Sequence, residues 1–189
     1  MIELNDTLEA RNRAEWRRWL KSNFRTSQGI WLIYYRKGSG RERIPYNDAV
    51  EEALCFGWID SNVKSIDQAR FAQRFSPRRP GSPYSPANKE RLRRLVAEGK
   101  VVKSVLATLG DLKEPRYVVA KDILEAIKAN RDAWVNYRKF SAAYKRIRIG
   151  FIEGARNRPA EFQKRLSYFI KMTAKGKQFG FGGIEKYYE

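Results

Sequence analysis

Residues 53–95 decide the fold, and they read ALCFGWIDSNVKSIDQARFAQRFSPRRPGSPYSPANKERLRRL. An apolar helix ends at Gly57, and two runs of strand-like composition follow at residues 58–64 and 69–76. Residues 66–68, which join these runs, are typical of a tight turn, so the stretch predicts a β-hairpin. The first half of the chain is therefore expected to contain a sheet.

Prolines recur at every third position after this hairpin, at Pro77, Pro80, Pro83 and Pro86. This spacing favours an extended path and excludes a helix, because proline lacks an amide hydrogen and fixes φ. Ser85 then offers an N-cap, with Pro86 at the first helical position, and Gly99 offers a left-handed residue for the far end. A helix is predicted between Ser85 and Gly99.

Earlier residues predict a helix, a strand and a second helix. Asp6, with Glu9 three positions later, forms a capping-box pattern, so we expect a helix from there to about Phe24. Residues 29–38, GIWLIYYRKG, place β-branched and aromatic side chains between glycines, which is typical of a strand. The second helix is expected to begin at Asn47.

The strand after Gly57 should pair beside the strand at residues 29–35. We therefore expect a common buried cluster of five side chains from the two strands: Phe56, Trp58, Ile59, Trp31 and Ile33.

After residue 111 every pattern is helical. Helices are predicted to begin at Asp122, where Glu125 completes a capping box, at Ser141 and at Pro159, and the last should end at Gly176. The expected fold class is α+β, with a small N-terminal sheet and flanking helices in residues 1–110. A basic all-helical domain at 111–177 follows, and a glycine- and aromatic-rich tail at 178–189 should be mobile unless it docks.

The composition of the 189 residues excludes several classes of protein. An apolar fraction of 42% with 13% aromatic residues indicates a globular chain. The absence of histidine removes His-based triads and His-ligated metal sites. The single cysteine, Cys55, has no internal disulfide partner. Because residues 1–20 lack a secretory apolar region and no run is long enough to span a membrane, we expect a cytoplasmic protein.

The net charge of +18 is unevenly distributed. Residues 70–100 hold nine basic and two acidic residues, a net of +7, and residues 139–177 hold eleven and two, a net of +9. Residues 1–69 sum to only +1. Two basic segments indicate a surface that attracts polyanions, and we expect them to form one contiguous face. The alternative is charge that serves only solubility.

Trp58 and Asp60 are the first candidate site residues. They could line a pocket in which Asp60 accepts a hydrogen bond from a ligand, or acts as a general base if burial raises its pKa. The alternative is that Trp58 packs in the core while Asp60 caps a turn or pairs with Lys64 or Arg74.

Basic and aromatic residues around the proline-rich turn form the second candidate site. Arg74, Arg78 and Arg91 should converge on one anion near the start of the Ser85–Gly99 helix, whose N-terminus presents unbonded amides. The further candidates in this segment are a fourth arginine for phosphate, an aromatic ring for stacking and a polar amide: Arg79, Tyr84 and Asn88. The alternative is a solvated basic face.

Residues 46–61, YNDAVEEALCFGWIDS, resemble the signature of the YdeI/OmpD-associated family, also described as bacteriocin-protection proteins. The resemblance continues through Lys64, Asp67 and residues 74–78 to Gly99, and it extends back to Trp19 and residues 29–32, so that it covers about residues 7–100. The later part resembles the family's C-terminal helical segment until Arg156, after which residues 157–159 depart from it.

This resemblance implies a small cytoplasmic protein associated with tolerance to cationic antimicrobial peptides, and an N-terminal fold related to the YjbR/CyaY-like group. It brings no agreed activity, cofactor or metal. The leading hypothesis is a non-enzymatic protein that binds an anionic ligand or nucleic acid. The alternatives are an enzyme acting on a small acidic or phosphorylated substrate in a Trp58/Asp60 pocket, and a protein that works through a protein partner. No residue is assigned as catalytic, and direct binding of a cationic peptide conflicts with the net charge of +18.

Overall fold

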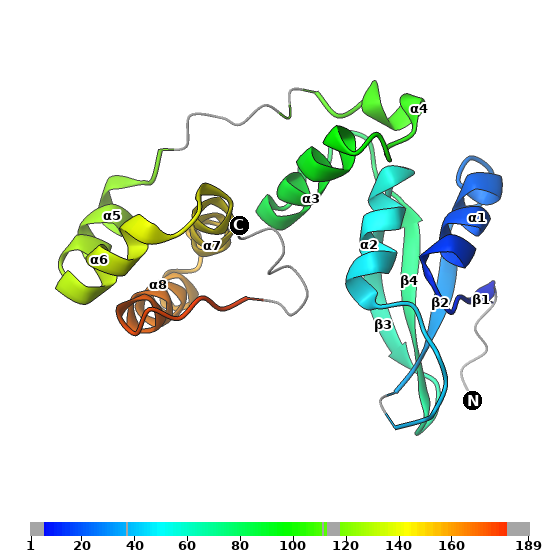
Figure 1. Ribbon diagram of the computed structural model, residues 1–189, viewed down its shortest axis with the longest axis horizontal. Coiled ribbons are helices and arrows are strands. Elements are labelled where there is room, and N and C mark those ends of the chain that lie inside the picture. The colour runs from blue at the N-terminus through cyan, green and yellow to red at the C-terminus, as the bar shows by residue number, and fades with distance from the viewer. Residues whose placement is uncertain (1–5, 37, 111, 113–117, 181–189) are drawn as a thin grey trace. The chain divides into compact units, whose positions relative to one another are not determined.

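The computed structural model describes residues 6–36, 38–110, 112 and 118–180. Contacts within the chain divide it into two units, whose elements are labelled in Figure 1. The first unit comprises Met1–Pro83 and Leu92–Asp111, and the second comprises Tyr84–Arg91 and Leu112–Glu189. Within the described residues, the strands all belong to the first unit, and the second unit is helical, so the α+β prediction is confirmed.

The sheet of the first unit has four strands in the order β1-β2-β4-β3. Their bounds are β1 (Thr7–Glu9), β2 (Ile30–Tyr35), β3 (Trp58–Ser65) and β4 (Arg70–Pro77). β1 runs parallel to β2, and the other pairs are antiparallel. The predicted hairpin is confirmed as β3 and β4, whose turn is held by Asp67, because its Oδ1 accepts the amides of Ala69 (2.9 Å) and Arg70 (2.7 Å).

Strand order departs from one prediction. β3 was expected beside β2, but β4 lies between them and pairs with β2 over six residues. The tight hairpin pairs one edge of β4 with β3, and β2 pairs with the other edge of β4. β3 consequently lies at the border of the sheet.

Two helices, α1 (Arg13–Asn23) and α2 (Tyr46–Cys55), cover one face of this sheet, which we call the inner face (Figure 1). Trp16 of α1 donates from Nε1 to the carbonyl of Ala49 in α2 at 3.0 Å. The ring of Trp16 also packs against Phe75 of β4, with 5.3 Å between ring centroids. An apolar layer between helices and sheet is therefore the core of this unit.

The side chains of β2 alternate strictly between the two faces. Ile30, Leu32 and Tyr34 are buried on the inner face, whereas Trp31 and its same-side neighbours are half-buried on the opposite face, which we call the outer face. The predicted burial of Phe56 and Trp58 is confirmed, at 3% and 1% exposure. Trp31, Ile33 and Ile59 were expected to be buried but are only half-buried. Their side chains point to the outer face, whereas α1 and α2 cover the inner face, to which the alternate residues of each strand point.

The N-terminus also differs from its prediction. Thr7–Glu9 is a strand, and Asp6 before it has a φ of 57°, a left-handed conformation that asparagine and aspartate tolerate. α1 begins after Asn12, whose Oδ1 accepts the amide of Glu15 at 3.0 Å. The capping role expected of Asp6 therefore belongs to Asn12.

The caps predicted for the helix after the proline-rich turn are confirmed. Ser85 Oγ accepts the amide of Asn88 at 3.2 Å at the start of α3 (Pro86–Ala97), and Gly99 follows its end with a φ of 65°. Residues 86–91 of α3 count with the second unit and residues 92–97 with the first. The short α4 (Lys103–Leu106) follows.

The second unit consists of the start of α3 and four further helices: α5 (Lys121–Lys128), α6 (Arg131–Lys139), α7 (Ala142–Glu153) and α8 (Pro159–Ala174). Three predicted ends are confirmed, since Ser141 Oγ accepts the amide of Tyr144 at 3.1 Å, Pro159 opens α8, and Gly176 follows it with a φ of 67°. The Asp122 capping box is wrong, because α5 begins after Ala120 and no side chain caps it.

One ion pair lies inside the second unit. Arg146 of α7 donates to both carboxylate oxygens of Glu90 of α3, at 2.7 and 3.0 Å, and both side chains are under 10% exposed. α7 approaches the start of α3 closely, because Gly150 contacts the ring of Pro86 with no room for a Cβ atom. The apolar core around this pair is built from α5, α6, α7 and α8.

The predicted tail falls partly outside the described residues, since 181–189 are not among them. Phe179, which is described, packs on the second unit: its amide donates to Tyr144 OH at 3.1 Å, and the Arg148 guanidinium lies 4.0 Å from its ring centre. In the described parts of the chain, no helix combines the length and the apolarity that crossing a bilayer requires.

Candidate functional site

Trp58 lies in the core of the first unit. Its side chain is 1% exposed, its Nε1 donates to the carbonyl of Phe24 at 3.2 Å, and its ring packs edge-on against Trp19 with 5.6 Å between centroids. An enclosed indole with a satisfied donor presents no ring face to a ligand. The structure therefore gives Trp58 a packing role.

Asp60 lies on β3 at the border of the inner face and is half-buried. Its Oδ2 accepts a 2.6 Å hydrogen bond from the hydroxyl of Tyr46, the first residue of α2. The nearby hydroxyl of Tyr34 is buried, and among the described residues it has no hydrogen-bond partner. Burial raises the pKa of Tyr34 well above its usual range, and the charges of Tyr46 and Asp60 add to this shift.

The outer face carries an aromatic ring between two cations. The Lys64 ammonium lies 4.9 Å from the ring centre of Trp31, and the Arg74 guanidinium carbon lies 5.7 Å from it. Trp31 and Arg74 are directly opposed on β2 and β4. Gly29 makes room for Arg74: its φ is 145°, and a Cβ atom there would lie 2.6 Å from Nη2 of the guanidinium. We call Trp31, Lys64 and Arg74 the Trp31 subsite.

A second aromatic ring lies on the same face, four residues further along β2. The Tyr35 ring has the Arg41 guanidinium 5.2 Å from its centre, and its hydroxyl donates to Glu9 Oε1 at 2.9 Å. Tyr35 and Arg41 line an open pocket of about 290 Å³ together with Ser39, Ala69 and Arg70. We call this the Tyr35 subsite. Two carboxylates reduce the local positive charge: that of Glu9, and that of Asp67, which pairs with Arg70 at 2.7 Å.

The remaining predicted site residues are divided between the two units. In the first unit, Arg78 donates to the carbonyls of Ser82 (2.8 Å) and Pro83 (3.2 Å), and Arg79 is exposed. The structure thus uses Arg78 to hold the proline-rich turn.

The other three lie in the second unit. Arg91 is 7% exposed and donates to Asn88 Oδ1 at 2.8 Å, and Tyr84 is half-buried. Because Arg91 counts with a different unit from Arg74 and Arg78, their convergence on one anion stays a prediction. The same holds for the contiguous positive face expected from the two basic segments.

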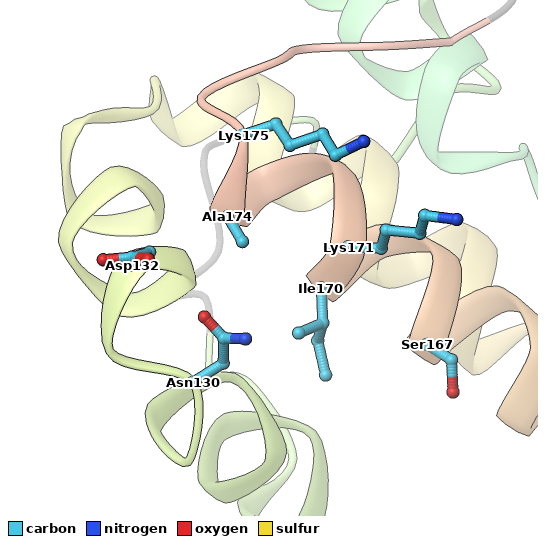
Figure 2. A pocket seen from close by; sticks show the side chains of 7 residues that line it. All are labelled: Asn130, Asp132, Ser167, Ile170, Lys171, Ala174 and Lys175. Atoms are coloured by element: carbon cyan, nitrogen blue, oxygen red, sulfur yellow. The ribbon is translucent and has the colours of Figure 1, made fainter.

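The second unit has an open pocket of about 560 Å³ between the α5–α6 turn and α8 (Figure 2). Its lining is mostly polar: Asn130, Asp132, Ser167, Ile170, Lys171, Ala174 and Lys175. Figure 2 shows the two lysine side chains extending to the same side of α8, while Asp132 points away from them. Two neighbouring ammonium groups with hydroxyl and amide donors nearby can bind an oxyanion.

Trp31, Tyr35 and Arg41 were not among the sequence candidates. The signal that could have found them is the alternation in IWLIYY, which places Trp31, Ile33 and Tyr35 on one side of a strand. The sequence does not say which side the helices cover, so Trp31 and Ile33 of this side were expected in the core.

Cys55 is a core residue. It is fully buried, and burial raises the pKa of its thiol to about 11. A thiol with such a pKa is a poor nucleophile at neutral pH. Among the residues that the structure describes, no group of three Cys, Asp or Glu side chains is placed to hold a metal ion.

Comparison with known proteins divides the chain near residue 110. Residues 8–108 match the model of a domain of unknown function, DUF8412. Residues 116–176 match the family described as bacteriocin-protection, YdeI or OmpD-associated. The family resemblance seen in the sequence is confirmed, although the match falls on the C-terminal helices rather than on residues 7–100. No curated protein and no solved structure matches the chain.

Proposed function

We propose that this is a non-enzymatic protein that binds single-stranded nucleic acid. The premise is that the chain belongs to the DUF8412 family over residues 8–108 and carries a YdeI/OmpD-associated segment over residues 116–176. The proposed binding surface is the outer face of the sheet in the first unit. The observation that carries the proposal is the Trp31 ring, half-buried on the face opposite to α1 and α2, with the cationic ends of Lys64 and Arg74 over it.

Single-stranded nucleic acid requires two kinds of contact, and this face offers both. Bases stack on aromatic rings, each contributing about 1–3 kcal/mol, and cations neutralise the phosphates between them. The Lys64 ammonium and the Arg74 guanidinium lie over the ring of Trp31, so a base that stacks there displaces at least one of them towards a phosphate. Cations over a half-buried indole, without a carboxylate partner among the described residues, therefore fit this ligand better than a purely apolar partner.

The spacing of the two subsites supports a strand that runs along β2. Trp31 and Tyr35 are four residues apart on one face, which corresponds to about 13 Å at roughly 3.3 Å per residue. About four nucleotides cover this distance at the duplex rise of roughly 3.4 Å, and fewer do when the strand is extended. The Tyr35 pocket, with Arg41 at its edge, would then receive a neighbouring nucleotide.

Substitution of Trp31 tests the proposal. We expect Trp31→Ala to weaken binding of a fluorescein-labelled twelve-nucleotide oligothymidylate by at least about five-fold, the effect of losing roughly 1 kcal/mol of stacking. Fluorescence anisotropy at fixed, low salt measures this loss. Trp31→Phe keeps a ring and should retain most of the affinity.

Val63→Ala provides the matched control. Val63 is an exposed apolar residue of β3. It lies directly opposite Gln73 of β4 and therefore on the inner face of the sheet, away from Trp31. Its loss should leave the affinity unchanged. Equal affinity of Trp31→Ala and the unaltered protein would contradict the proposal, as would an equal loss in Val63→Ala.

The enzyme alternative rests on the hydroxyl and carboxylate groups of Tyr34, Tyr46 and Asp60. The buried Tyr34 hydroxyl beside a 2.6 Å Tyr46–Asp60 hydrogen bond is the observation in its favour. Against it, the Trp58 ring that was to line the pocket is enclosed, and Asp60 is half-exposed rather than buried. If the cluster binds a small molecule, Tyr34→Phe should abolish that binding and leave oligonucleotide affinity unchanged.

The family description adds a cellular role to this proposal. Protection against a bacteriocin or a cationic peptide would be indirect, because a chain of net charge +18 repels a cation. We propose a cytoplasmic location, where nucleic acid is an abundant polyanion and the unpaired Cys55 thiol fits the redox conditions.

A further inference from the structure

α8 carries a line of basic residues on its exposed side. Lys164, Lys171 and Lys175 are exposed, and Tyr168, which is 51% exposed, lies between them in the sequence. The steps of four, three and four residues from Lys164 to Lys175 keep all four on one side of the helix. At about 1.5 Å per residue, the line is about 16 Å long.

These lysines differ from three arginines of the same unit, which form ion pairs. Arg146 pairs with Glu90, Arg156 with Asp122 and Glu153, and Arg165 with Glu161. Among the described residues, no carboxylate lies within ion-pair distance of Lys164, Lys171 or Lys175, although the charge of Lys164 helps to lower the pKa of Glu161. These three positive charges are therefore available to a ligand, whereas those of the three paired arginines are balanced within the unit.

The pocket at one end of this line supplies neutral donors. Ser167 and Asn130 line it with Lys171 and Lys175, and the acidic lining residue Asp132 points away from the two lysines (Figure 2). Asn130 Oδ1 accepts the amide of Ala133, so its Nδ2 group is directed elsewhere as a donor. Donors and cations together fit a phosphodiester, whose two charged non-bridging oxygens accept hydrogen bonds from several directions.

We infer that α8 forms a second nucleic-acid contact, one that binds the phosphate backbone of a single strand through Lys164, Lys171 and Lys175 without reading its sequence. The inference takes its ligand class from the proposed function but uses none of the outer-face residues. Its energy comes from release of counterions rather than from stacking. The two contacts consequently differ in their dependence on salt.

The salt dependence of oligonucleotide binding tests the inference. For single strands, log affinity falls with log salt with a slope of about −0.7 for each phosphate neutralised. We expect Lys171→Gln combined with Lys175→Gln to make the slope shallower by about 1.4, measured by anisotropy with a twenty-nucleotide oligothymidylate between low and moderate salt. Adding Lys164→Gln should reduce the slope further, by about 0.7.

Lys121→Gln combined with Lys139→Gln is the matched control, because it removes the same two charges from exposed positions on α5 and α6. Its change in slope should be less than half that of the α8 pair. Equal changes in the two pairs would overturn the inference and indicate only a general effect of net charge. No change in slope for the α8 pair would overturn it as well.

The two experiments distinguish a failure of this inference from a failure of the proposed function. Loss of binding in Trp31→Ala with an unchanged slope in the α8 pair would leave the sheet site and remove the α8 contact. A shallower slope in the α8 pair with unchanged affinity in Trp31→Ala would support the α8 contact and remove the sheet site.

Discussion

The outer face of the sheet and the interior of the helical unit use arginine in opposite ways. Arg74 lies over Trp31 at a half-exposed position with room made by Gly29, whereas Arg146 closes on Glu90 at under 10% exposure. The segment that contains Arg146 holds the larger share of the net charge, and some of its arginines are held in ion pairs. Net charge in a sequence therefore does not say which cations a ligand can reach.

The largest expected effect comes from breaking the buried pair. Arg146→Met keeps the length of the side chain but leaves the Glu90 carboxylate buried without its partner. Removal of one member of a buried pair costs about 3–5 kcal/mol. Urea unfolding followed by the fluorescence of Trp134, the tryptophan of the second unit, measures the loss.

Two variants separate the pair from general packing. Arg146→Met with Glu90→Leu removes both charges of the pair and should recover at least half of the lost stability. Arg156→Met breaks a pair at the surface, so its loss should be much smaller than that of Arg146→Met. Equal losses for Arg146→Met and Arg156→Met would show that burial does not distinguish the two arginines.

The contact that brings α3 to α7 predicts a smaller effect. Gly150→Ala forces a Cβ atom into the rigid ring of Pro86, and overpacking of this kind costs about 1–3 kcal/mol. Gly154→Ala is the matched control, because the nearest atoms to its Cβ would be the carbonyl oxygens of Gly150 and Phe151, at 3.4 and 3.7 Å. Thermal unfolding of the two variants checks the prediction, which fails if Gly154→Ala is the more damaging change.

On the outer face, removal of an arginine should affect binding more than stability. Arg74→Met loses a cation–π contact worth about 0.5–1 kcal/mol at an exposed site, so the unfolding free energy should change by no more than that. The salt slope of oligonucleotide binding should become shallower by about 0.7. A loss of stability comparable to that of Arg146→Met would remove the contrast between the two regions.

The smallest effect is expected at an exposed ion cluster at the end of α3. Hydrogen bonds from Lys100 and Arg94 lower the pKa of Glu98 from 4.5 to about 2. The stabilisation is therefore present above pH 4.5 and is lost as pH falls towards 2. Because these side chains are exposed, we expect no more than about 1 kcal/mol. Melting temperatures of Glu98→Gln and the unaltered protein should differ slightly at pH 6 and converge near pH 2.

Local chemistry allowed much of the fold to be predicted. Ser85, Gly99, Ser141, Pro159 and Gly176 mark helix ends through hydrogen bonds or φ angles that involve only neighbouring residues. The β3–β4 hairpin was predicted from two strand-like runs joined by a short turn at residues 66–68. The prediction that Asp6 caps the first helix failed because two capping-box patterns lie close together, Asp6 with Glu9 and Asn12 with Glu15. In addition, the strand Thr7–Glu9 forms through pairing with β2, which lies further along the chain.

The sequence by itself determined the α+β class, the family of the C-terminal helices and the excess of positive charge. The tertiary structure decided which of these residues face solvent. Trp31 and Trp58 both lie on strands among apolar neighbours, and only the packing of α1 and α2 on one face makes Trp58 a core residue and leaves Trp31 on the other side. The physical reason is that strand alternation is local, whereas the choice of covered face and the partner of each charge depend on contacts between distant residues.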